Sequence, residues 1–201
     1  SNDGTADETE LKKRGVTNLI TLKKSKGLSY QLRAGYAFAL KEKYSSIITI
    51  DGNGKDDPTG ILKIICSLQQ GYDYVQGCRF MQGGKAINTP PLRLLAIRLI
   101  HAPLISLAAR YWLTDTTNGF RGYSSRYLTS NKVQPFRHIF QTYELLAYLS
   151  SRASILKFKV IEVPVTRKYP KKGIPTKIHG IGGYTRLMRI LFYNLLGKYN
   201  P

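Results

Sequence analysis

The chain has 201 residues, 42% of them hydrophobic, which is enough to bury the core of one α/β domain. Lys and Arg number 31 against 12 Asp and Glu, and the formal net charge of +19 indicates a polyanionic partner such as nucleic acid, membrane phosphate or nucleotide phosphate. The two cysteines, Cys66 and Cys78, lack metal-ligand spacing, which argues against a disulfide framework or a zinc site.

The first half of the chain alternates helical and strand patterns. Residues 28–44 have helical spacing, and residues 46–51 form an apolar run that ends on the carboxylate of Asp51. A second helix is predicted after Pro58, to about Gln69, and a short strand follows at residues 72–77. This alternation predicts an α/β fold with a mostly parallel central sheet flanked by helices.

Residues 92–113 form an amphipathic helical stretch that carries several arginines and is expected to be interrupted at Pro103. Two interpretations stay open: a helix in a membrane interface with its arginines at headgroup level, or an ordinary helix pair that covers the sheet. No run of about 20 uncharged apolar residues occurs, so no membrane-spanning segment is expected.

The second half continues with a strand at 119–123, a helix at 140–152 and a strand at 157–165. Residues 166–180 then combine Lys and Arg with Pro and Gly, which is typical of a loop, before a final amphipathic helix near 183–197. We predict one catalytic domain over residues 1–180, with the C-terminal amphipathic helix in residues 181–201 packed on it or following it.

Asp51 is the first candidate site residue, because ligands of parallel sheets bind where the carboxyl ends of strands meet. Asp51 and Asn53 are two residues apart, so both side chains can reach one ligand. Carboxylate and amide oxygens suit Mg²⁺ or Mn²⁺ that bridges a diphosphate. The alternative is a polar turn that caps the helix after Pro58 with Asp57 at its N-cap, and these residues alone favour that alternative.

Five segments share the order and spacing of one enzyme family. The first two are an acidic turn at residues 2–9 and an aspartate-rich strand end at 50–58. A Gly-Cys-Arg-Phe stretch at 77–84, an Asp-Thr-Thr-Asn-Gly-Phe-Arg block at 114–123 and a late strand at 162–166 follow. With these segments the chain resembles the family-two glycosyltransferases, in particular the branch of dolichol-phosphate mannose synthase and related polyprenyl-phosphate or surface-polysaccharide sugar transferases. The likeness extends from residue 2 to about residue 180.

The resemblance implies a nucleotide-diphospho-sugar transferase fold of the A type, normally opened by a strand and helix that would precede residue 1. It also implies an inverting hexosyltransferase that moves a sugar from a UDP- or GDP-linked donor to a polyprenyl or dolichyl phosphate, or to a lipid-linked or surface glycan. The expected place is the cytoplasmic face of an anionic membrane, bound peripherally, in the biosynthesis of cell-envelope polysaccharide.

By resemblance, Asp3 contacts the base or ribose of the nucleotide, and Asp51 faces the metal and the diphosphate. Asn53 departs from the family, which usually has a second aspartate there, so the neutral amide weakens the expected cation site. The ammonium of Lys55 can compensate phosphate charge directly. Arg79 and Arg121 match arginines that approach the phosphates of donor or acceptor.

The resemblance also assigns the basic loop that begins at Arg167 and Lys168, with Lys171, Lys172 and Lys177, to closure over the diphosphate and the lipid phosphate. A phosphate acceptor is already an anion and needs no general base, whereas a sugar hydroxyl needs a carboxylate within hydrogen-bond reach. Asp115 and Glu144 are the candidates for that base.

Two alternatives from other classes stay open. The charge, with 14 Tyr and 7 Phe, is compatible with a nucleic-acid-binding module, but the chain has no recognised binding motif. Asn53 keeps open an inactive scaffold that binds sugar nucleotides. The three histidines are isolated from the motifs and receive no role.

Overall fold

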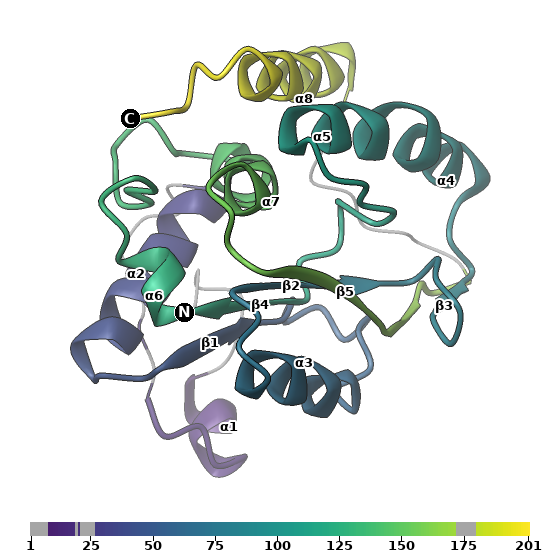
Figure 1. The fold of residues 1–201 in the computed structure, drawn as a ribbon. Coiled ribbons are helices and arrows are strands. Elements are labelled where there is room, and N and C mark those ends of the chain that lie inside the picture. Colours follow the sequence, from purple (N-terminus) through teal and green to yellow (C-terminus); the bar gives the residue numbers. More distant parts are fainter. Residues whose placement is uncertain (1–7, 19, 21–26, 172–179) are drawn as a thin grey trace.

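A four-stranded sheet lies at the centre of the structure, a computed structural model that describes residues 8–18, 20, 27–171 and 180–201. Its order is β1-β4-β2-β5, from Ser46–Thr49, Arg121–Ser124, Tyr74–Cys78 and Val160–Pro164. Helix α3 (Gly60–Gln69) covers one face (Figure 1). On the side of the other face lie α7 (Glu144–Ile155) and α5 (Ala102–Ala109), with α8 (Gly180–Leu195) packed on these two helices, which confirms the predicted α/β class.

The direction of β4 corrects the prediction of a mostly parallel sheet. Strands β2 and β5 pair in parallel, but β4 is antiparallel to both of its neighbours, β1 and β2. The sheet is therefore mixed, with β1, β2 and β5 pointing one way and β4 the other. The apolar pattern does not reveal this reversal, because a strand covered on both faces has the same composition in either direction. A second, two-stranded parallel sheet joins β3 (Lys85–Ile87) to β6 (Thr166–Lys168).

Alternation along the strands divides the core into two layers. Tyr74 and Tyr123 point toward the face that carries α7, where the ring of Tyr123 packs against Tyr36 of α2 (Leu28–Lys41) and against Tyr74. Val75 belongs to the layer on the other face, and Gly122 lies against α3. Side chains on neighbouring positions of a strand point to opposite faces, so the same four strands serve both layers.

One long helix runs over the upper face, because α4 (Pro91–Ala96), the π-helix η1 (Ile97–His101) and α5 follow one another without a break. The interruption expected at Pro103 is wrong. The backbone N–H of Ala102 donates to Ile97 O, five residues back, so the helix widens immediately before the proline, whose nitrogen has no proton to donate. Among the described residues this is the one helix whose length and composition would allow a membrane crossing, with 19 residues and mean hydropathy 1.6. Only 28% of its most apolar stretch is buried.

Helix α8 lies beside α5 and over α7 (Figure 1). Ile190 and Leu191 of α8 are buried in the same core as Ile105 and Tyr148. The helix begins three residues earlier than the sequence predicts. The short helices α1 (Glu8–Lys13) and α6 (Ser125–Leu128) complete the described elements. The division at residue 180 stays a prediction.

Gly122 gives a direct test of how closely α3 packs on the sheet. A Cβ atom at this position would lie 2.5 Å from Ile64 Cγ2, so we expect Gly122→Ala to destabilise the fold by about 1–3 kcal/mol through overpacking. Gly35→Ala is the matched control, because a Cβ there meets nothing within 4 Å and alanine is the better helix former by about 1 kcal/mol. Urea unfolding of both variants measures the difference, and equal free energies of unfolding would contradict the packing.

Candidate functional site

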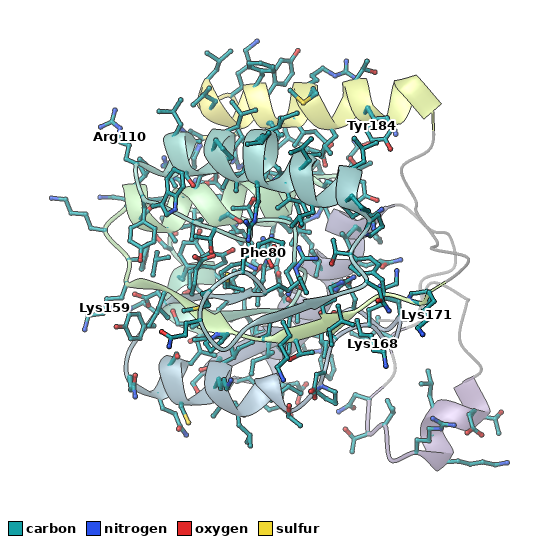
Figure 2. All side chains as sticks on the ribbon, turned by 90° about the vertical axis from the view of Figure 1, so that its right-hand side faces the viewer. Phe80, Arg110, Lys159, Lys168, Lys171 and Tyr184 are labelled. Carbon is teal, nitrogen blue, oxygen red and sulfur yellow. The ribbon has the colours of Figure 1, made fainter. Side chains whose placement is uncertain are left out.

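Three strands that point the same way bring their carboxyl ends to one edge of the sheet. Asp51 follows β1 by two residues, Arg79 follows β2 directly, and Arg167 follows β5 by three residues. We call the charged group at this edge, Asp51, Asp56, Arg79, Asp115 and Arg167, the strand-end cluster. In Figure 2 this edge lies on the side of Lys168 and Lys171.

Arg167 joins two carboxylates of the segment after β1. Its Nη2 lies 3.0 Å from Asp51 Oδ2, and its Nη1 lies 2.5 Å from Asp56 Oδ2. Burial alone would lower the pKa of Arg167, but Asp56 and Asp51 outweigh it and raise that pKa. Burial raises the pKa of Asp56, although Arg167 opposes this shift. Asp56 is buried, whereas the side chain of Asp51 keeps 35% of its surface exposed, so Asp51 is the carboxylate that a ligand can reach.

Asp51 and Asn53 do lie together, as expected from their spacing. Asn53 Nδ2 donates to Asp51 Oδ2 over 3.4 Å, and Asn53 Oδ1 accepts from the backbone of Lys55. A Cβ at Gly119 would lie 2.6 Å from Asp51 Oδ1, so only glycine allows this close approach. The described residues contain no group of three or more His, Cys, Asp and Glu side chains arranged to hold a metal. The metal role predicted for Asp51 and Asn53 stays a prediction.

Asp57 takes part in the polar turn before α3, but the N-cap residue of that helix is Thr59 rather than the predicted Asp57. Asp57 Oδ1 accepts from both the backbone N–H and the hydroxyl of Thr59, just before α3. These hydrogen bonds lower the pKa of Asp57. No hydrogen bond joins Asp51 to this turn in the described part of the chain, where its partners are Arg167 and Asn53.

Arg79 and Asp115 form a buried bidentate ion pair. Arg79 Nε lies 2.6 Å from Asp115 Oδ2, Nη2 lies 2.7 Å from Oδ1, and the backbone N–H of Arg79 also donates to Oδ2. Burial alone would lower the pKa of Arg79, but Asp115 raises it. Both oxygens of Asp115 are occupied, which disfavours the predicted role of Asp115 as a general base.

Arg121 is buried beneath the site rather than exposed to it. Its guanidinium donates to the carbonyl oxygens of Asn118, Thr116 and Leu146 and to the hydroxyl of Ser150, over 2.8–3.0 Å. A phosphate contact by Arg121 would require this network to open. The geometry therefore favours a structural role, in which Arg121 holds the backbone of residues 116–118 in place.

Tyr169 lies at the centre of the basic side of the cluster. Lys55 Nζ lies 5.2 Å from its ring centroid, and the guanidinium carbons of Arg93 and Arg167 lie 5.5 and 5.6 Å from it. Arg79 Nη1 donates to the Tyr169 hydroxyl over 3.4 Å. Burial alone would raise the pKa of Tyr169, but Arg79 and Arg167 outweigh it and lower that pKa. Such a gathering of cations suits an anionic ligand.

The structure also describes Lys168 and Glu144, two further residues predicted for the site. Lys168 is exposed, and its backbone N–H donates to Lys55 O, which ties β6 to the segment after β1. Glu144 begins α7 and accepts from the backbone N–H groups of Gln141 and Thr142. Within the described chain, no hydrogen bond or ion pair connects Glu144 to the strand-end cluster. This position disfavours Glu144 as the general base.

Asp3, Lys172 and Lys177 lie outside the described residues. Their predicted roles stay predictions.

Sequence reasoning missed Asp56, Asn118 and Tyr169. Asp56 Oδ1, Asn118 Nδ2 and Arg167 Nε are buried without a hydrogen-bond partner, although the three residues lie in one network. Orphaned buried polar atoms are uncommon in proteins and often mark a site completed by water or a ligand. Asp56 and Asn118 lie inside two of the quoted motifs, and Tyr169 lies in the predicted basic loop, directly after Lys168. These positions were the available signal.

The long upper helix contacts the loop that carries Asp115. His101 Nδ1 lies 2.7 Å from Thr116 Oγ1. Burial, assisted by Arg121, lowers the pKa of His101 to about 4, so His101 is neutral at physiological pH. Phe80 lies between the guanidinium groups of Arg79 and Arg98, at 4.9 and 5.0 Å from its ring centroid. The helix and the cluster therefore share their packing.

The chain has distant relatives among known proteins. It is 25% identical over 201 residues to a polyprenol monophosphomannose synthase of Mycolicibacterium smegmatis, an alignment that covers 98% of this chain and 74% of that protein. It is 26% identical over 196 residues to an uncharacterised protein of Methanocaldococcus jannaschii, covering 96% and 79% of the two chains. No protein-family profile matches the chain. The chain is thus similar, at a distance and over almost its whole length, to a glycosyltransferase.

The Arg79–Asp115 pair predicts a large stability effect. We expect Asp115→Asn to destabilise the protein by about 3–5 kcal/mol, because it leaves the buried charge of Arg79 without a counterion. The double variant Arg79→Gln/Asp115→Asn removes both charges and should recover part of that loss. Urea unfolding at pH 7 measures the coupling, and strictly additive effects of the single and double variants would contradict the pair.

Proposed function

We propose that this protein is an inverting glycosyltransferase that moves a sugar from a UDP- or GDP-linked donor to a polyprenyl phosphate. A lipid-linked or surface glycan is the alternative acceptor. The observation that carries the proposal is the strand-end cluster, where an accessible carboxylate, Asp51, lies beside Arg167 and a group of cations around Tyr169. The name of the mycobacterial relative supports the same class of acceptor.

The reaction needs stabilisation of negative charge more than proton transfer. An oxygen of the acceptor phosphate attacks the anomeric carbon, and the bond to the nucleoside diphosphate breaks with its electron pair on the leaving phosphate. Lys55 and Arg167 can balance that charge from fixed positions, and electrostatic stabilisation of this kind usually contributes most to enzymatic rate enhancement. The oxygens of Asp115 and Glu144 are already taken by hydrogen bonds, which supports an acceptor that needs no general base.

We also propose a divalent cation, Mg²⁺ or Mn²⁺, as the partner of Asp51 and Asn53. These side chains offer hard oxygen ligands, and Mg²⁺ is commonly bound by one or two carboxylates with substrate phosphates completing its shell. When bound, the ion would neutralise charge on the leaving diphosphate. Arg167 already contacts Asp51 Oδ2 and would share this task.

Asp51→Asn tests the transfer reaction. We expect a loss of activity of about 100-fold or more, because the carboxylate that faces the diphosphate is neutralised. Asp57→Asn is the matched control, since Asp57 lies in the same segment but serves Thr59. The assay measures sugar transfer from a panel of UDP- and GDP-sugars to a polyprenyl phosphate in lipid vesicles with added Mg²⁺ or Mn²⁺.

Two results of that assay would oppose the proposal. Turnover that is equal in Asp51→Asn and the parent would remove Asp51 from the reaction. An absence of turnover with every donor, together with tight, salt-sensitive oligonucleotide binding, would favour the nucleic-acid module instead.

We further propose that the upper helices rest on the surface of an anionic membrane, with the protein bound peripherally at the cytoplasmic face. Large apolar side chains stand exposed along the long helix and α8 and in the turns that follow them (Leu92, Leu95, Leu99, Leu107, Trp112, Tyr184, Phe192 and Leu196). The two helices lie side by side on one side of the molecule (Figure 2). Exposed apolar side chains on a protein with a net charge of +19 suit an interface rich in anionic lipid.

Leu95→Glu/Leu99→Glu tests this surface. We expect binding to anionic vesicles at low salt to weaken by more than about tenfold, because each buried leucine contributes about 1.5–3 kcal/mol. Leu62→Glu is the control, since Leu62 is as exposed as Leu99 but belongs to α3, on the opposite face of the sheet. Cosedimentation measures binding, and an equal loss in the control would show charge rather than the surface to be responsible.

A further inference from the structure

A groove of about 700 Å³ lies where three helices end, away from the strand-end cluster. It is lined by the last residues of α5, α7 and α8 and by the turns that follow them. Lys157, at the groove, precedes β5 by three residues, whereas Arg167 follows β5 by three, so the two sites lie at opposite ends of one strand. Figure 2 accordingly shows Arg110, another residue of the groove, at the opposite side from Lys168.

Three cations line the groove: Arg110, Arg152 and Lys157. None of the ion pairs found in the described part of the chain includes any of them, and no lining residue is acidic. Arg152 Nε and Nη2 both donate hydrogen bonds to Lys132 O, which fixes the position of the Arg152 side chain. The groove therefore holds three cations that form no ion pair within the described chain.

Cations near helix C-termini often only compensate the negative end of the helix dipole. The charge of the three helix ends is therefore compared with that of the three cations. Each helix end contributes about −0.5 charge, so three ends contribute about −1.5 against three full positive charges. A net positive charge of about 1.5 remains. The dipoles alone do not account for the cations.

Two of these cations have an unusual backbone conformation. Arg110 directly follows α5 and Lys157 lies two residues after α7, and both have positive φ, 49° and 62°, where glycine is the favourable residue. The third helix, α8, follows that rule with Gly197 at φ 69°. Two helices thus end near a cation at the groove in a conformation that glycine would adopt at lower cost. Lys43 has the same conformation after α2, so this feature only adds to the charge and the buried amide that mark the groove.

A buried amide and an apolar pocket complete the site. Asn194 is 7% exposed and lines the groove, and its Nδ2 has no hydrogen-bond partner while its Oδ1 pairs with Ser151. An adjoining pocket of about 460 Å³ shares Arg110 with the groove and is lined by apolar side chains that include Trp112. Cations and an unpaired N–H donor therefore lie next to an apolar pocket.

We infer that this groove is a second binding site, for the phosphate headgroup of an anionic lipid, whose chains lie in the pocket beside Trp112. Arg110 and Lys157 bind the phosphate, with Asn194 as a neutral donor. The site is separate from the strand-end cluster and does not depend on the proposed transfer reaction. Its place at the end of α5 and α8 is where a lipid of the docking membrane would meet the protein.

Trp112 provides the measurement, since it is the only tryptophan of the chain and is 70% exposed. Dihexanoyl phosphatidic acid, a soluble short-chain lipid, is titrated against the full chain while tryptophan emission is recorded. We expect a saturable blue shift. Dihexanoyl phosphatidylcholine, with the same chains and a zwitterionic headgroup, should bind about tenfold more weakly, because it lacks the net negative charge that the cations recognise.

The decisive variant is Arg110→Gly/Lys157→Gly, which removes both cations and relieves both strained positions. We expect about tenfold weaker binding of dihexanoyl phosphatidic acid with no fall in melting temperature. Lys43→Gly is the matched control, because Lys43 is also an exposed cation with positive φ, 62°, after a helix, and it lies outside the groove. It should bind like the parent, as should Asp51→Asn, which separates this site from the transfer reaction.

Three results would overturn the inference. The first is unchanged affinity in Arg110→Gly/Lys157→Gly. The second is equal affinity for the two dihexanoyl lipids. The third is competition by glycerol 3-phosphate as strong as that by dihexanoyl phosphatidic acid, which would assign the groove to free phosphate compounds rather than to lipid.

Discussion

The ion pairs of Arg167 are the constraint on which the candidate site depends. Arg167 follows β5, whereas Asp51 and Asp56 follow β1, at the other edge of the sheet, so two salt bridges join segments more than 100 residues apart. A buried guanidinium is tolerated only if it is paired, and a buried Asp56 only if it has a counterion. Each group therefore holds the other in place, and Asp51 is fixed with one face toward solvent.

Sequence reasoning located the strand end but not the partners of its residues. The apolar run before Asp51 was enough to place this carboxylate at the edge of the sheet, since strand length and sheet class follow from local pattern. The pairing of Arg79 with Asp115 and the burial of Arg121 were not accessible, because a motif names residues without their contacts. Family likeness suggested phosphate for both arginines, and the structure places one in an ion pair and the other beneath the loop.

The same limit explains the errors in the fold. The reversed direction of β4 leaves no trace in a short strand that is covered on both faces. Pro103 was expected to interrupt its helix because proline removes one hydrogen bond, but a π-helical turn at residues 97–101 absorbs the loss and the helix continues. In both cases tertiary packing decides the outcome, and packing cannot be deduced from one stretch of sequence.

The π-helical turn also connects the proposed membrane surface with the strand-end cluster. Arg93, Arg98 and His101 all come from the long upper helix, and they contact Tyr169, Phe80 and Thr116 respectively. Tyr169 and Phe80 both contact Arg79, and the backbone of Thr116 is held by Arg121. Since packed side chains do not deform continuously, a shift of this helix at a membrane must either move these loops or break contacts that are buried. The helix that would bind lipid is therefore also the support of the residues that would bind phosphate.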